Sequence, residues 1–179
     1  MCSYRKILST CLLLLWLWPA GVVYPQAGEY EVKAAFLYNF TQFVHWPESA
    51  FSAPDTAFQL CIVGEDPFGR TLDDIVTTEF VDRHPIVVRR IREVENTTAC
   101  HMIFIAKKTD IPFEMVLQTI GELPILVVGE LPEFAEKGGT IAFRVVNRRI
   151  RLEVNLSAAR MANLKISSKL LRLSTIVEN

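Results

Sequence analysis

The stretch GGTIAFRVVNRRIRLEVN, residues 138–155, decides the fold of the last third of this chain. Within residues 141–146 and again within 149–154, every second side chain is apolar. Alternation with a period of two is typical of a half-buried β-strand. Asn147 and Arg148 between the two runs fit a two-residue turn, because Asn tolerates positive φ. The stretch therefore predicts an antiparallel hairpin with one apolar face and the cross-strand pairs Val145–Ile150, Phe143–Leu152 and Ile141–Val154.

The other face of this hairpin is rich in arginine. The same register places Arg144 directly opposite Arg151, with Arg149 nearby. Like charges opposite each other destabilise a sheet, so an acidic group is expected beside them. That group is Glu153 on a solvated face, a partner protein or a small anionic ligand, since guanidinium groups suit carboxylates and phosphates. The three arginines are therefore candidate partner- or ligand-binding residues.

Two short helical segments are expected after the hairpin. Ser157 is suited to cap the first of them, and Asn163 is suited to end it in the left-handed region. Ser167 or Ser168 can start a further turn that carries Leu170, Leu171 and Leu173. Exposed leucines of this turn, with Leu170 and Leu171 as the candidates, would be typical interface contacts. The alternative is that they belong to the core.

Upstream of the hairpin, short apolar runs alternate with amphipathic segments. Strands are predicted at 58–64, 86–91, 102–106 and 124–128, and helices at 29–44, after Asp66-Pro67, after Ile111-Pro112 and at 131–136. This alternation predicts a three-layer α/β fold, in which a largely parallel sheet is flanked by helices and the C-terminal hairpin adds antiparallel strands at one edge. With 179 residues, half of them hydrophobic, one domain over residues 28–179 is expected.

The first predicted helix has an apolar stripe that includes Val32, Phe36 and Phe40 and that ends at Trp46-Pro47. Ligands of parallel sheets favour the carboxyl ends of the strands. The loops at 64–69 and 129–132 follow predicted strands and are candidate pocket lining. Ordinary turn chemistry is the alternative interpretation of both loops.

The beginning of the chain resembles a secretory signal peptide. Arg5 and Lys6 precede a short apolar run at 7–18, which is too short to span a membrane comfortably. Residues 1–27 are the expected signal, with cleavage after Ala20 or an uncleaved anchor as alternatives. Removal of residues 1–27 leaves 17 basic and 20 acidic residues, a charge of about −3 that argues against nucleic-acid binding.

Of the four cysteines, Cys61 and Cys100 remain after this cleavage. An even pair in an exported chain predicts a disulfide, although two buried free thiols would fit the same count. Two isolated cysteines lack the paired spacing of a zinc site. The three histidines are scattered, and the nucleotide-binding and hydrolase motifs are absent from the sequence. We therefore expect no catalytic residues, no metal and no cofactor.

Several motifs together resemble the YfiR/HmsC-like periplasmic family. They are VKAAFLYNF at 32–40, FVHWP at 43–47, LCIVGEDPFG at 60–69, CHMIFI at 100–105, GGTIAF at 138–143, VNLSAA at 154–159 and SSKLL at 167–171. The motifs occur in the same order as in the family, and together they cover essentially the whole chain that follows the signal.

This resemblance implies a function that no residue spacing could show. Members are periplasmic dimers that bind the periplasmic portion of an inner-membrane diguanylate cyclase and repress it, which lowers cyclic-di-GMP and biofilm formation. A disulfide at Cys61–Cys100 supports the fold, and a second disulfide of some relatives has no counterpart here. The alternative function is a periplasmic protein that binds a small anionic ligand.

Overall fold

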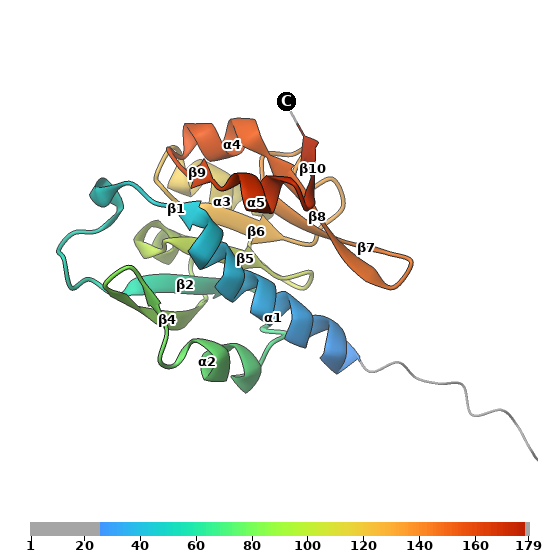
Figure 1. Ribbon diagram of the computed structural model, residues 1–179, viewed down its shortest axis with the longest axis horizontal. Coiled ribbons are helices and arrows are strands. Elements are labelled where there is room, and N and C mark those ends of the chain that lie inside the picture. The colour runs from blue at the N-terminus through green and yellow to red at the C-terminus, as the bar shows by residue number, and fades with distance from the viewer. Residues whose placement is uncertain (1–25, 178–179) are drawn as a thin grey trace, which may run out of the picture.

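The computed structural model describes residues 26–177, so nearly all of the predicted signal peptide lies outside the described residues. Eight strands form one mixed sheet in the order β10-β8-β7-β6-β5-β2-β4-β3, with helices on both faces (Figure 1). The strands are β2 (Phe58–Val63), β3 (Phe80–Val81), β4 (His84–Ile91), β5 (Met102–Ile105), β6 (Leu126–Gly129), β7 (Ile141–Val146), β8 (Arg149–Asn155) and β10 (Ser174–Val177). A small separate ladder pairs β1 (Val44–His45) with β9 (Lys165–Ile166).

The sheet separates two hydrophobic cores. One core contains residues of α1 (Gln26–Phe43), α2 (Arg70–Val76) and α5 (Ser168–Leu171). The other contains residues of α3 (Phe113–Ile120). The 3₁₀ helices η1 (Glu48–Ala50) and η2 (Val94–Ala99) and the short helix α4 (Leu156–Met161) complete the order of elements. This arrangement confirms the predicted three-layer α/β fold.

The strand directions confirm a largely parallel sheet. β2 pairs in parallel with β4 and β5, β5 with β6, and β6 with β7. The antiparallel pairs are β7–β8 and β3–β4. The hairpin does not form the edge itself, because β10 returns and pairs in parallel with β8. The sequence did not predict β10, because this strand has only four residues and no alternating pattern of apolar side chains.

The hairpin has the predicted register. Val145 pairs with Ile150, Phe143 with Leu152, and Ile141 with Val154. Asn147 and Arg148 have φ of 50° and 61°, as a two-residue turn with positive φ at both central positions requires. Near the turn the hairpin extends beyond α1, and Val145 and Val146 are about half exposed there. Its apolar face is therefore buried at the base and open at the tip.

Helix α1 is rotated relative to the predicted stripe. Val32 is 47% exposed, whereas the neighbouring Lys33 is fully buried together with Leu37 and Phe40. The prediction that Val32 begins the buried stripe was wrong. Lys33 is buried there instead, because its ammonium has carboxylate partners in the interior. The buried face therefore starts with a charged residue, which a hydrophobic pattern cannot identify.

Two smaller expectations were also wrong. Residues 131–136 form turns in place of a helix, because Glu133 has φ of 56° and the Phe134 ring packs on the backbone of Gly139. A Cβ on Gly139 would lie 2.1 Å from that ring. Helix α4 is capped by Asn155 rather than Ser157, since the Asn155 side chain accepts a hydrogen bond from the Ala158 N–H at 2.9 Å. Asn163 does end this region with φ of 52°, and Ser167 caps α5.

Candidate functional site

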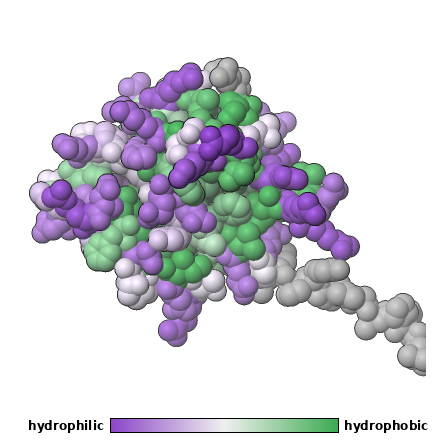
Figure 2. All heavy atoms as spheres, in the orientation of Figure 1, coloured by the Kyte–Doolittle hydropathy of each residue, from purple (hydrophilic) through white to green (hydrophobic). Residues whose placement is uncertain are grey.

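The arginine face is the surface of the hairpin that carries Arg144, Arg149, Arg151 and Val146. Arg144 lies opposite Arg151, and Val146 lies opposite Arg149. Of the candidates for the acidic group, Glu153 is present beside these arginines, and its Oε1 is 3.5 Å from the Arg144 Nε. Its Oε2 is buried and has no hydrogen-bond partner within residues 26–177. Figure 2 shows hydrophilic and hydrophobic surface side by side where the hairpin projects. One carboxylate among three guanidinium groups leaves this face positively charged.

The C-terminal leucines differ in exposure. Leu170 lies in the core with 3% of its surface exposed, and Leu171 packs against the same core. Leu173, by contrast, is 73% exposed. Leu173 immediately precedes β10, whose first residue, Ser174, pairs with Leu152 of the hairpin. Within the leucine segment that the sequence offered as a contact, Leu173 is therefore the most exposed side chain.

Cys61 and Cys100 form a disulfide with Cα atoms 6.0 Å apart. Cys61 lies inside β2, and Cys100 lies just before β5, the strand that pairs with β2. Both residues are buried, with 0% and 4% of their surfaces exposed. The bond therefore ties neighbouring strands inside the core, and solvent cannot reach it without opening of the fold. This geometry supports a structural role.

The amino ends of the parallel strands carry a stack of rings that sequence reasoning missed. Phe51 lies parallel to His84 at 3.7 Å between ring centroids and stacks on His101 at 4.6 Å. The His101 Nδ1 accepts the Gln59 N–H at 2.9 Å, and its Nε2 lies 3.0 Å from the Ala50 carbonyl. Burial lowers the pKa of His101, and the nearby His84 adds to this effect. The neutral imidazole thus holds the loop of Phe51 against the sheet.

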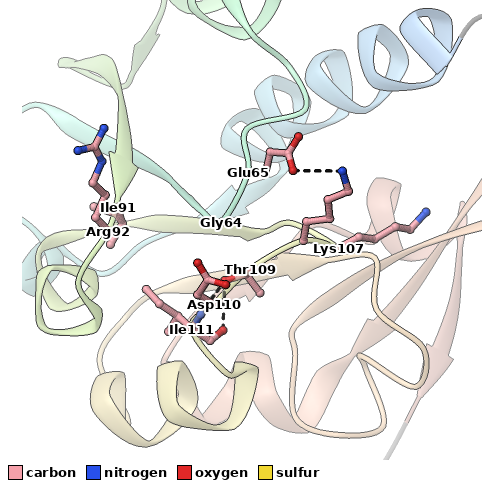
Figure 3. A pocket seen from close by; sticks show the side chains of 9 residues that line it. Gly64, Glu65, Ile91, Arg92, Lys107, Thr109, Asp110 and Ile111 are labelled. Carbon is pink, nitrogen blue, oxygen red and sulfur yellow. Dashed lines mark hydrogen bonds and ion pairs between the residues drawn. The ribbon is translucent and has the colours of Figure 1, made fainter.

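The carboxyl ends of the strands border two cavities. The outer cavity, about 700 Å³, is lined by Gly64, Glu65, Ile91, Arg92 and residues 107–111. Figure 3 shows Arg92 on one side of it and Glu65 on another. The inner cavity, about 350 Å³, is lined by Tyr30, Glu65, Pro67, Ala106, Lys107, Lys108 and Glu130. Parts of both loops expected as pocket lining, at 64–69 and at 129–132, therefore do line a cavity.

A buried ion cluster lies at the inner cavity. The Lys33 ammonium contacts the carboxylate of Glu29, and it lies 2.5 Å from the Glu130 Oε2. The Tyr30 hydroxyl donates to the Glu130 Oε1 at 2.9 Å, and the Lys107 ammonium lies 3.5 Å from Oε2. Burial and the Glu130 carboxylate together raise the pKa of Tyr30. Sequence reasoning missed this cluster, because its members come from α1 and from the loops after β5 and β6.

Two kinds of feature are absent from the described residues. Residues 26–177 contain no group of three or more His, Cys, Asp or Glu side chains that could hold a metal ion. Over the same residues, no helix is both long and apolar enough to cross a bilayer.

A family model described as YfiR/HmsC-like matches residues 30–175, well over half of the chain. The chain belongs to the YfiR/HmsC-like family. Proteins of this family are known as periplasmic regulators of diguanylate cyclases, and the family is regulatory rather than catalytic. The Cys61–Cys100 disulfide of this YfiR/HmsC-like chain fits an oxidising compartment.

Comparison with solved structures supports the fold of this YfiR/HmsC-like protein. It is similar to a conserved domain protein from Vibrio cholerae O1 biovar El Tor strain N16961, with a TM-score of 0.56 and 10% sequence identity. The match covers 84% of this chain and 60% of the Vibrio chain, so this protein spans less than two thirds of that structure's length. At this identity the likeness concerns the fold alone. A search of curated proteins found no match.

Proposed function

We propose that this protein is an exported periplasmic regulator that binds the periplasmic portion of an inner-membrane diguanylate cyclase and represses it. Residues 1–27 are its signal peptide, and residues 28–179 act as a single domain, as a homodimer. Repression lowers cyclic-di-GMP and biofilm formation. Family membership supports this role, and the described surface offers a suitable contact.

The arginine face is the observation that carries the proposal. Arg144, Arg149 and Arg151 lie on a projecting hairpin with Glu153 as their neighbouring acidic group. Arginine and exposed apolar side chains are typical interface anchors, and here Val146 is 51% and Leu173 is 73% exposed. Leu171 packs against the hydrophobic core. The partner surface should therefore be acidic with an apolar centre.

Repression through this surface is a shift of the cyclase between two states. The protein must bind the inactive cyclase more tightly than the active one, and the difference in binding free energy limits the repression. A partner carboxylate at Arg144 and Arg151 would relieve the repulsion between them. The same groups would speed association with an acidic partner, an effect that weakens as salt increases.

The test compares two arginine variants in cells. Protein with a C-terminal tag is purified from gently solubilised membranes, and the bound proteins are identified by mass spectrometry. The Arg144→Ala/Arg151→Ala variant should recover about tenfold less cyclase than the unmodified protein, because interface arginines are frequent hot spots. Cyclic-di-GMP in these cells should rise.

Arg160→Ala is the matched control, since Arg160 is exposed on α4 and lies outside the arginine face. It should recover as much cyclase as the unmodified protein does. If the protein is abundant and folded but captures no membrane protein with a cyclase domain, the repressor function is wrong. If capture is equal in both variants, the repressor stands and its contact surface lies elsewhere.

A further inference from the structure

The inner cavity differs from an ordinary surface hollow in what lies beneath it. Glu130 lines the cavity, yet only 2% of its side chain is exposed, and the Lys33 ammonium that neutralises it is buried as well. Removing a charged pair from water is unfavourable, and an apolar pair of similar volume would often be at least as stable. Buried ionisable groups in a cleft are typical of functional sites.

The contacts of Glu130 leave one cation available to a ligand. The Glu130 carboxylate already has the Lys33 ammonium at 2.5 Å and the Tyr30 hydroxyl at 2.9 Å. Lys107 lies farther away, at 3.5 Å, and 57% of its side chain is exposed to the cavity and solvent. The other lysine of the lining, Lys108, pairs with Glu65 at 3.2 Å. Lys107 therefore has donors that the described residues do not fill.

The loops that carry Glu65 and the two lysines are tied to each other at the edge of the sheet. The Glu65 N–H donates to the Lys108 carbonyl at 2.7 Å, which ties the loop after β2 to the loop after β5. Gly64 has φ of +97°, and a Cβ there would lie 2.4 Å from the same carbonyl, so only glycine fits. Pre-formed walls at the carboxyl ends of parallel strands are typical of small-molecule sites.

We propose that the inner cavity binds a compact metabolite through an anionic group, a carboxylate or a phosphate, held by the Lys107 ammonium. Lys108 lies at the same rim, and the Tyr30 ring and Pro67 offer apolar surface to the rest of the molecule. The volume of about 350 Å³ lies at the small end of the range for such sites. This site is separate from the arginine face, and the proposal does not rest on cyclase binding.

The test uses the purified protein alone, labelled with ¹⁵N, and follows backbone amide signals by NMR. Succinate, inorganic phosphate and sodium chloride are titrated separately at neutral pH. We expect saturating shifts at Glu65, Lys107, Lys108 and Glu130 with succinate or phosphate, at concentrations on the order of 10 mM for such small probes. A response to succinate alone assigns a carboxylate ligand, and a response to phosphate alone assigns a phosphate ligand.

Two variants decide whether Lys107 is the recognising group. Lys107→Gln should weaken binding about tenfold, because a charge-assisted hydrogen bond is lost. Lys137→Gln is the matched control, since Lys137 is similarly exposed at 51%, pairs with Glu133 and does not line the cavity; its affinity should not change. Shifts that sodium chloride reproduces, shifts centred on the arginine face, or equal affinity in Lys107→Gln would overturn the proposal. These outcomes leave the cyclase proposal untouched.

Discussion

At the amino ends of β4 and β5 the buried titratable side chains are two histidines, whereas the carboxyl ends of β5 and β6 border a lysine and a glutamate. His84 and His101 are stacked with Phe51 and bonded to backbone groups. Lys33 and Glu130 are bonded to each other beneath an open cavity. Both ends bury polar groups, and the carboxyl end also borders the inner cavity, which is lined by two lysines and two glutamates.

The difference follows from the chemistry of the side chains. A histidine can be buried in its neutral form, so His101 fastens the loop of Phe51 to the sheet without a counter-ion. A lysine and a glutamate buried in their charged forms need each other, and they stabilise the fold only if every contact is complete. We infer that the buried histidines at the amino end stabilise the fold and that the charged side chains at the carboxyl end serve to bind a ligand.

The largest effect should come from breaking the ion cluster. Lys33→Met leaves the Glu130 carboxylate buried with the Tyr30 hydroxyl and the more distant Lys107 ammonium as its remaining donors. We expect the free energy of unfolding to fall by about 3–5 kcal/mol, measured by urea denaturation. The double variant Lys33→Met/Glu130→Gln removes both charges and should recover much of this loss. Equal, small losses in the single and double variants would show that the two charges are not coupled.

The disulfide should have a comparable but slightly smaller effect. Its cysteines are separated by 39 residues along the chain, and the loop-closure entropy for that length corresponds to roughly 4 kcal/mol. The variant Cys61→Ala/Cys100→Ala should lose stability by up to this amount in the same denaturation experiment. Because the bond is buried, reductant should act only slowly on the native protein.

The cysteine variant also tests whether the two ends of the sheet have separate roles. The cysteine variant, where folded, should bind succinate or phosphate at the inner cavity as the unmodified protein does. A loss of cavity binding without a loss of stability would show that the disulfide acts on the carboxyl end, contrary to the division of roles inferred here.

The smallest effect should be a pH dependence at the amino end. Burial lowers the pKa of His101 from its ordinary value of 6.5, so the unfolded chain binds more protons than the native protein just below that value. The contribution of His101 to stability is therefore complete above pH 6.5. It is lost progressively as the pH falls from 6.5 towards the lowered pKa of the native state.

Urea denaturation between about pH 7.5 and pH 5 measures this dependence. His101→Asn keeps an acceptor for the Gln59 N–H but does not titrate, so its stability should change less with pH than that of the unmodified protein. His45→Asn is the control, because His45 is exposed. If the free energy of unfolding of His101→Asn changes with pH as much as that of the unmodified protein, His101 is not the source of the pH dependence.

Local patterns predicted much of this fold. The hairpin register, the Asn147-Arg148 turn and the approximate positions of the four parallel strands followed from neighbouring residues alone. The sequence also predicted that Arg144 lies opposite Arg151 and gave Glu153 as one of three candidates for the acidic group beside them, because cross-strand pairing in a tight hairpin is fixed by the turn. The cysteine pair followed from the expected export of the chain.

The candidate site at the carboxyl end could be predicted only in part. The loops at 64–69 and 129–132 were expected to line a pocket because they follow strands. Lys33 was not expected there, since a lysine on an amphipathic helix normally faces solvent. The sequence also offered the leucine segment as a contact but could not give which leucine is exposed: Leu170 is buried, and Leu173 is 73% exposed.

The sequence alone predicted the hairpin, its arginine face, the approximate positions of β2, β4, β5 and β6, and the helices α1, α2 and α3. Which charges are buried and which rings stack followed only from the tertiary structure. Lys33 and Glu130 are 97 residues apart, and Phe51 lies 33 and 50 residues from its two histidines. The free energy of a charge or a ring depends on what surrounds it in space, and periodicity along the chain carries no information about neighbours that distant.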